Sequence, residues 1–172
     1  MDMKAISSRF AYTKILLVDD EIYMRKVVRT MLMGMGVRTI HEAADGPAGL
    51  EMIRGVAPDI VILDWEMPGL DGPAFVRMVR SPMTFPLPDV PIIMLTGHGE
   101  RSRVIEAITV GVNEFLLKPV SSKALQDRLI AVLAKPRPVV QSGAYYGPAP
   151  RKLMTAINVD NDRALNSLFM VN

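Results

Sequence analysis

Residues 60–69 read Ile60-Val61-Ile62-Leu63-Asp64-Trp65-Glu66-Met67-Pro68-Gly69, and this stretch decides the fold. Four apolar residues, three of them β-branched, run directly into an acid, and a Pro-Gly turn signal follows. A short apolar run bounded by turn residues is typical of a strand that is buried on both faces. A carboxylate at the end of such a strand is costly unless a partner pairs it or a reaction uses it. We therefore interpret Asp64 as the reactive group of the protein.

Strand and helix patterns alternate on both sides of this buried strand. Apolar runs typical of short strands occupy residues 14–18, 37–43, 91–95 and 114–117. Helical patterns, set by apolar spacing or by helix-start residues, lie at residues 24–35, 45–55, 71–79, 101–110 and 121–134. Five strands that alternate with five helices predict an α/β fold, a doubly wound parallel sheet covered by helices on both faces.

Polar residues end four of the five predicted strands, namely Asp19-Asp20, Asp64, Thr96 and Lys118. In a doubly wound sheet, the functional groups gather beyond the carboxyl ends of the strands. If the first and third strands are neighbours, three carboxylates come together there. Like charges that close cannot all stay ionised unless a cation offsets them.

A divalent cation resolves this conflict, and oxygen ligands of this kind suit Mg²⁺. Lys118 adds a positive charge, and the Thr96 hydroxyl adds a hydrogen-bond donor. Together with a metal they would make a pocket for a phosphoryl group, whose transfer depends mostly on positioning and charge neutralisation. In such a pocket the Asp64 carboxylate can act as the nucleophile and form an acyl phosphate.

The composition excludes several classes of protein. The chain has 172 residues, of which 49% are hydrophobic and 22% charged, which is enough apolar material for a full core. The absence of Cys excludes disulfides and thiolate metal sites. No apolar run reaches the length of a membrane span, and we see no signal peptide, so we expect a cytoplasmic protein. A net charge of +2 without a basic stripe gives no reason to expect nucleic-acid binding.

The two ends of the chain differ from the region between them. Residues 1–13 form an N-terminal extension before the first predicted strand. From residue 136 onward, repeated Pro and Gly predict a linker without regular elements. A short helix at 160–170 could follow, with its apolar side docked on this domain or on a neighbour's. That side consists of Leu165, Leu168 and Phe169.

Residues 14–135 resemble the response-regulator receiver domains of bacterial two-component signalling (the CheY-like family), over about seven tenths of the chain. The resemblance rests on the Asp19-Asp20 pair, on Leu63-Asp64-Trp65-Glu66-Met67-Pro68-Gly69-Leu70-Asp71-Gly72, on Met94-Leu95-Thr96-Gly97, and on Phe115-Leu116-Leu117-Lys118-Pro119. It implies a flavodoxin-like fold with strand order 2-1-3-4-5 and five helices. It also implies phosphorelay signal transduction by a phosphoprotein.

The resemblance assigns a role to each residue at the strand ends. Asp64 would accept a phosphoryl group from a histidine kinase or a histidine phosphotransfer protein. Asp20, Asp64 and the backbone carbonyl of Glu66 would hold Mg²⁺ or Mn²⁺, with Asp19 helping through water. Lys118 would contact the phosphoryl oxygens.

Three further positions complete the picture that the resemblance implies. Thr96 would move toward the phosphoryl group, and Phe115 would change rotamer with it. Phe115 replaces the Tyr that is often found there, so its side chain has no hydroxyl. The peptide bond between Lys118 and Pro119 would be cis, which is affordable before proline.

Glu66 and His98 lie two residues after Asp64 and Thr96, at positions that tune phosphoryl lifetime in this family. We hypothesise that they flank the route of the attacking water. Taken singly, other readings stand: Asp64 could be a turn former, and His98 an exposed loop residue. Trp65 reads as a partly exposed loop aromatic beside the site.

The favoured interpretation is a stand-alone receiver, a phosphoacceptor that catalyses its own phosphorylation and dephosphorylation and is not an enzyme. A downstream protein would read the surface formed by residues 101–110, 114–117 and 121–134; homodimerisation is left open. The alternatives are a Mg²⁺-dependent phosphatase with an Asp nucleophile and a phosphorylation-independent scaffold. A DNA-binding regulator is disfavoured, because the tail lacks the length and the basic helix of a helix-turn-helix.

Overall fold

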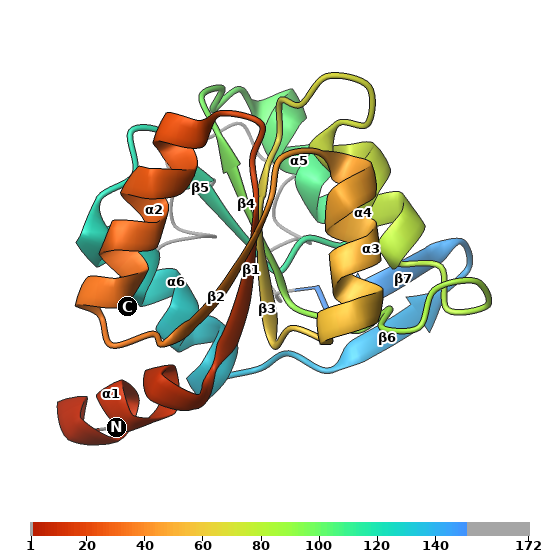
Figure 1. The fold of residues 1–172 in the computed structure, drawn as a ribbon. Helices are drawn as coiled ribbons and strands as arrows, with labels where there is room; N and C mark the ends of the chain where they lie inside the picture. The colour runs from red at the N-terminus through yellow and green to blue at the C-terminus, as the bar shows by residue number, and fades with distance from the viewer. Residues whose placement is uncertain (1, 151–172) are drawn as a thin grey trace.

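The five predicted strands form one parallel sheet in the order β2-β1-β3-β4-β5, as the resemblance implies (Figure 1). The computed structural model describes residues 2–150, so the predicted helix at 160–170 and its docking lie outside the described residues. The strands are β1 (Lys14–Val18), β2 (Thr39–Ala43), β3 (Ile60–Asp64), β4 (Ile92–Thr96) and β5 (Glu114–Leu117).

Helices cover both faces of the sheet. One face carries α2 (Ile22–Gly34) and α6 (Ser122–Ala134), and the other carries α3 (Gly46–Val56), α4 (Gly72–Val79) and α5 (Arg101–Val110) (Figure 1). Polar side chains cap three of these helices, two of them at the helix-start residues that the sequence predicts, Asp45 and Asp71. The side chains of Asp45, Asp71 and Ser121 accept hydrogen bonds from backbone N–H groups at 2.8, 2.9 and 3.1 Å.

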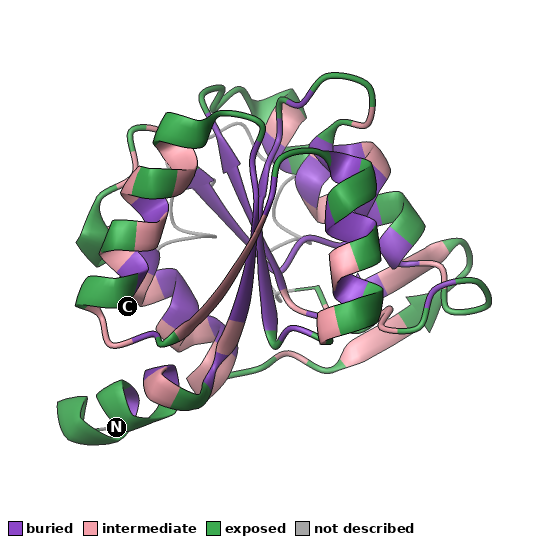
Figure 2. Ribbon diagram, viewed as in Figure 1, coloured by how far each residue is buried: buried purple, intermediate pink, exposed green. Residues whose placement is uncertain are grey.

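The strand at the centre is buried along its whole length, as its apolar run predicts (Figure 2). Alternate side chains of β3 enter different cores because successive residues of a strand point to opposite faces. Val61 and Leu63 pack with α3, α4 and α5, whereas Ile60 and Ile62 pack with α2 and α6. This two-sided burial fixes β3 as the rigid base from which Asp64 projects.

The prediction of five helices is wrong, because the described residues contain six. The additional helix, α1 (Met3–Tyr12), begins at Asp2, whose side chain caps the Lys4 N–H. Only Ile6 and Phe10 of α1 are buried, and they lie in an apolar hollow beside Ile130 and Leu133 of α6. Two apolar residues at a spacing of four give too weak a periodic signal to reveal a helix on their own. None of the helices within residues 2–150 has the length and apolar character of a bilayer-crossing segment.

The prediction of a linker without regular elements after residue 136 is also wrong in part. Residues 139–148 form an antiparallel hairpin of β6 (Val139–Ser142) and β7 (Tyr145–Pro148). Gly143 turns the chain with a φ of 58°, a conformation in which glycine carries no steric penalty. Pro148 lies at the end of a two-stranded ribbon, where a missing N–H is tolerated.

Long-range contacts fasten this hairpin to the domain. Arg137 donates hydrogen bonds to the carbonyl oxygens of Asn113 and Ala149, and the Tyr146 hydroxyl donates to Asp89. A Cβ added at Gly147 would lie 2.9 Å from the Cα of Gly111, the residue that ends α5. The hairpin therefore packs backbone against backbone on the C-terminal end of α5.

A buried arginine organises the region beneath the hairpin. Arg80 donates to the carbonyl oxygens of Pro88, Val90 and Gly111 at 2.6, 2.7 and 3.0 Å, and to Asn113 Oδ1 at 2.9 Å. Burial lowers the pKa of Arg80 to about 10, so the guanidinium stays charged at neutral pH. Arg80 thus joins the loop before β4 to the turn before β5, and the hairpin covers that junction.

We predict that the hairpin is part of the folded unit. A chain that ends at residue 135 should unfold at a lower urea concentration than one that ends at residue 150. The expected loss is about 2–4 kcal/mol, because buried residues and hydrogen bonds to a charged group are removed. Equilibrium urea unfolding followed by circular dichroism measures this difference. Equal midpoints for the two chains would contradict the prediction.

Candidate functional site

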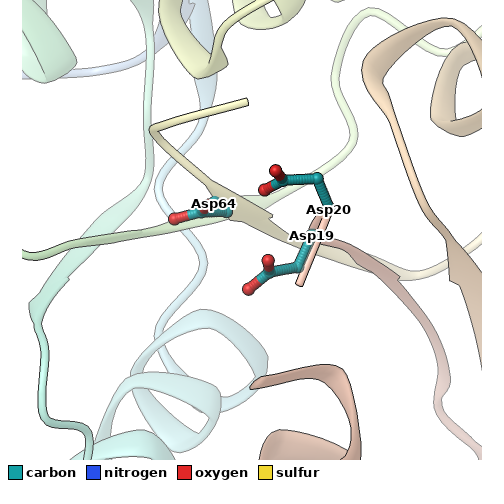
Figure 3. A group of neighbouring side chains, drawn as sticks. All are labelled: Asp19, Asp20 and Asp64. Carbon is teal, nitrogen blue, oxygen red and sulfur yellow. The ribbon is translucent and has the colours of Figure 1, made fainter. Parts of the chain in front are cut away.

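Three carboxylates meet at the carboxyl end of the sheet (Figure 3). Asp19 and Asp20 follow β1, and Asp64 ends β3, the strand that pairs with β1. Each offers an oxygen atom, and these atoms all lie within 4.8 Å of one another. Asp19 and Asp64 are buried, at 1% and 3% exposure, whereas Asp20 is exposed. The sheet topology therefore brings together the acids that the sequence places at the ends of separate strands.

Asp19 is the most deeply buried of the three acids. Its Oδ1 atom accepts a hydrogen bond from the Glu21 N–H at 2.8 Å. Its Oδ2 atom is buried without a hydrogen-bond partner and lies 4.0 Å from Lys118 Nζ. Burial raises the pKa of Asp19 to about 6, against the effect of the Glu21 N–H and with a further contribution from the negative charge of Asp64.

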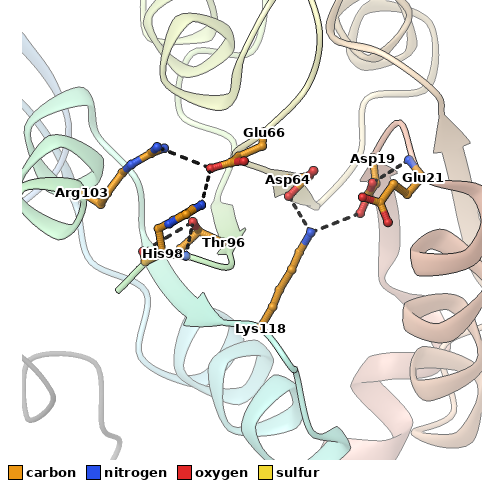
Figure 4. Close-up of polar contacts among 8 residues, drawn as sticks. All are labelled: Asp19, Glu21, Asp64, Glu66, Thr96, His98, Arg103 and Lys118. Atoms are coloured by element: carbon orange, nitrogen blue, oxygen red, sulfur yellow. Dashed lines mark hydrogen bonds and ion pairs between the residues drawn. The ribbon is translucent and has the colours of Figure 1, made fainter. Parts of the chain in front are cut away.

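Lys118 pairs directly with the acid that the sequence identifies as reactive (Figure 4). Its Nζ atom donates to Asp64 Oδ1 at 2.8 Å. Burial raises the pKa of Asp64 even though this hydrogen bond opposes the shift. Burial also disfavours the charge on Lys118, but the hydrogen bond to Asp64 and the charges of Asp64 and Asp19 outweigh it and raise the Lys118 pKa. The peptide bond between Lys118 and Pro119 is cis.

The acidic cluster fits a hard divalent cation. All three candidate ligand atoms are carboxylate oxygens, the ligand type that Mg²⁺ and Mn²⁺ prefer. The unpartnered Oδ2 atom of Asp19 is a buried acceptor that the described protein groups leave without a hydrogen bond. Lys118 is a single ammonium group beside two buried carboxylates, so negative charge remains in excess. The residues present therefore suit the metal that the sequence predicts.

Thr96 and Phe115 lie on the neighbouring strands, β4 and β5. Thr96 is fully buried, and its hydroxyl oxygen accepts a hydrogen bond from the His98 N–H at 3.1 Å. Phe115 is buried and meets the Trp65 ring edge-on, with 6.5 Å between ring centroids. The expectation that Trp65 is partly exposed is wrong, since only 4% of its surface is accessible. Trp65 instead packs between the end of β3 and Phe115.

Glu66 and His98 contact one another at the mouth of the site (Figure 4). His98 Nε2 lies 3.1 Å from Glu66 Oε1, and an Arg103 guanidinium nitrogen lies 3.4 Å from the same oxygen. The Arg103 guanidinium also lies over the Trp65 ring, 4.7 Å from its centroid. Arg103 is a site residue that was not predicted from the sequence. The sequence offers one signal. The helix dipole disfavours a cation in the first turn of a helix, so another interaction is expected to stabilise a cation placed there.

The arrangement can support attack by a carboxylate on an anionic electrophile. Asp64 is fixed by a rigid strand, and Lys118 supplies a positive charge within hydrogen-bond distance. Thr96 supplies a hydroxyl from the strand that pairs with β3. Such an array can bind and orient a phosphoryl group, because that chemistry depends on positioned charge.

Comparison with known proteins agrees with this geometry. The sequence profile of the response regulator receiver domain matches residues 15–130. The chain is 35% identical over 116 residues to chemotaxis protein CheY-3 of Vibrio cholerae, covering 67% of this chain and 88% of the relative.

Two solved structures are similar over the same region. A putative response regulator from Chloroflexus aurantiacus has a TM-score of 0.66 and 33% sequence identity, over 72% of this chain and 98% of the matched one. The CheX-CheY-BeF3-Mg complex from Borrelia burgdorferi has a TM-score of 0.65 and 25% identity, over 72% of this chain and 90% of the matched one. Together with the matches in sequence, they show that the chain belongs to the response regulator receiver domain family.

Proposed function

We propose that this protein is a phosphorylation-controlled switch in which Asp64 accepts a phosphoryl group from a histidine kinase or a histidine phosphotransfer protein. The observation that carries the proposal is the buried Asp64 carboxylate, hydrogen-bonded to Lys118 and grouped with Asp19 and Asp20. A structural role alone does not account for three carboxylates in one cluster, since their mutual repulsion is costly. The proposed partners would meet this protein in the cytoplasm.

In the proposed reaction, an Asp64 carboxylate oxygen bonds to the phosphorus of a phosphohistidine. The N–P bond of the donor breaks, and its electron pair remains on the imidazole nitrogen. Lys118 moves from its hydrogen bond with Asp64 to the phosphoryl oxygens, whose negative charge it offsets. Asp19, Asp20, Asp64 and the Glu66 carbonyl would hold Mg²⁺ or Mn²⁺, which supplies charge neutralisation at the phosphoryl oxygens when bound.

The output begins at Thr96. Its hydroxyl is engaged by the His98 N–H in the present state, and it would turn to donate to a phosphoryl oxygen. Phe115 would change rotamer in response, against the Trp65 ring that now meets it edge-on. We propose that these changes alter the surface of α5, β5 and α6, which a downstream protein or a second copy of the chain then binds. The similarity to a chain from a CheX-CheY complex that contains BeF3 and Mg²⁺ supports this reading.

The Mg²⁺-dependent phosphatase is the weaker candidate. Phosphatases of the haloacid dehalogenase group use a second Asp two residues after the nucleophile as a general acid and base. Here that position holds Glu66, whose carboxylate is engaged by His98 and Arg103. We therefore propose that the protein catalyses its own phosphorylation and dephosphorylation, and not the hydrolysis of a small phosphorylated substrate.

We predict one added phosphoryl group after incubation with Mg²⁺ and acetyl phosphate. Intact-mass spectrometry should show the gain in the wild type and in Asp127→Asn, and no gain in Asp64→Asn. Asp127 is a matched control because its carboxylate lies on α6 in a pair with Lys123 at 2.9 Å.

Two results would count against the proposal. A gain of mass that survives in Asp64→Asn would place the phosphoryl group elsewhere. No gain in the wild type, with Mg²⁺ binding demonstrated, would favour the scaffold or a phosphatase that turns over too quickly to trap.

We also predict that Asp19→Asn stabilises the metal-free protein at neutral pH. The pKa of Asp19 is raised to about 6 from an ordinary value of 3.8, so wild-type stability falls as pH rises between these values. At 1.36 kcal/mol per unit, the variant should be more stable than the wild type by about 3 kcal/mol above pH 6. Below about pH 3 the two proteins should be equal, because Asp19 is then neutral in both the folded and the unfolded state.

Urea unfolding in the presence of a chelator measures this difference across the pH range. Asp127→Asn serves again as the control and should show no comparable gain. An Asp19→Asn protein that is less stable than the wild type at pH 7 without divalent metal would contradict the assignment of strain to the buried carboxylate.

A further inference from the structure

Arg103 occupies a position that its own helix disfavours. It lies in the first turn of α5, and no acidic residue lies in that turn. The positive end of the helix dipole opposes a cation there. Glu100 precedes the helix but makes no capping hydrogen bond with its side chain. Arg103 instead contacts two residues at the mouth of the site. One of its guanidinium nitrogens lies 3.4 Å from Glu66 Oε1, and its Cζ atom lies 4.7 Å from the centroid of the Trp65 ring.

The stack on Trp65 fixes where this charge lies. Trp65 is buried and braced edge-on by Phe115, so its ring is a rigid platform. A guanidinium held over an aromatic ring gains a cation–π attraction and loses rotational freedom. Arg103 is two-thirds buried, with a side-chain exposure of 32%, whereas Glu66 is about half exposed. The cation is therefore the anchored member of the pair, and Glu66 is the member that it positions.

A positively charged partner is favourable for Glu66 because its carboxylate lies beside the acidic cluster. Its backbone N–H approaches Asp64 closely enough to lower the pKa of that acid, so its side chain leaves the chain at the rim of the acidic cluster. The carboxylates at the rim and in the cluster include those of Asp19, Asp20, Asp64 and Glu66. The Glu100 carboxylate also lies at the rim, 3.5 Å from His98 Nδ1. An anionic phosphodonor that approaches Asp64 meets this negative field, which Lys118 offsets from one side.

We propose that Arg103 is a positioning residue for phosphoryl transfer: anchored on Trp65, it holds and neutralises the Glu66 carboxylate so that an anionic phosphodonor can reach Asp64. This inference rests on the proposed function. With an acyl phosphate as donor, an Asp64 oxygen forms a bond to phosphorus, the bond from phosphorus to the acyl oxygen breaks, and the carboxylate leaves with the electron pair. Arg103 takes no part in these bond changes and acts only through Glu66.

The test compares Arg103→Met, Glu66→Gln and the double variant with the wild type. The rate constant for phosphorylation by acetyl phosphate in Mg²⁺ is followed by intact-mass spectrometry. At low ionic strength Arg103→Met should be slower by about threefold to tenfold, and at about 0.5 M salt by less than twofold, because salt screens the exposed Glu66 charge. The double variant should match Glu66→Gln within about twofold, since the Glu66 charge on which Arg103 is proposed to act is absent from both.

Arg77→Met is the matched control. Arg77 also joins another element to α5, through Glu106 at 3.5 Å, but it lies on α4 away from Glu66. This variant should keep the wild-type rate. The chain has one Trp, so the emission of Trp65 should change in Arg103→Met and stay the same in Arg77→Met without any donor.

Several outcomes would overturn the inference. One is an unchanged phosphorylation rate constant in Arg103→Met, and another is unchanged Trp65 emission in that variant. A third is a double variant that is phosphorylated more slowly than Glu66→Gln, which would make Arg103 a purely structural residue. Failure of the proposed function is distinguishable, because the wild type itself would then gain no phosphoryl group that depends on Asp64.

Discussion

Everything at the site depends on the burial of two carboxylates, those of Asp19 and Asp64, beside a single ammonium group. Lys118 Nζ lies 2.8 Å from Asp64 and 4.0 Å from Asp19, so one positive charge serves both acids. Because the compensation is incomplete, burial raises the pKa of each acid and leaves Asp19 Oδ2 without a hydrogen bond. A site under this strain gains stability from a divalent cation, and it gains reactivity toward a group that carries charge away from Asp64.

The topology of the sheet holds these charged side chains close together. Parallel pairing places β1 and β4 on either side of β3, and β5 beyond β4, so the carboxyl ends of these strands converge. The side chains of β3 alternate between two cores, and this fixes the direction in which Asp64 leaves the strand. The surface that we propose a partner binds begins at the same edge, because α5 starts just beyond Thr96. The proposed acceptor and this surface would therefore share one rigid base, and the hairpin packs on the far end of α5.

The order of elements along the chain could be predicted because it is encoded locally. The acidic cluster could be predicted only on the condition that the first and third strands are neighbours, which the resemblance implies. Apolar runs and cap residues mark each strand and helix, and polar residues such as Thr96 and Lys118 fall where strands end. What could not be predicted depends on distant contacts. Residues 139–148 form a hairpin because Gly147 meets Gly111 and because Arg137 reaches Asn113. The place of Arg103 in the first turn of α5 is a local signal, but its contact with Trp65 arises only when folding brings the helix against that ring.

The central claim is that the phosphoryl group resides on the Asp64 carboxylate. Borohydride reduces an acyl phosphate to an alcohol and leaves an ordinary carboxylate untouched, so treatment after phosphorylation should convert Asp64 to homoserine. Tandem mass spectrometry of the peptides that contain residues 19–20 and residues 60–69 would locate the change. We predict homoserine at position 64 only, dependent on Mg²⁺ and on the phosphodonor. Conversion at Asp19 or Asp20 instead, or at none of the three acids in a protein that has gained a phosphoryl group, would contradict it.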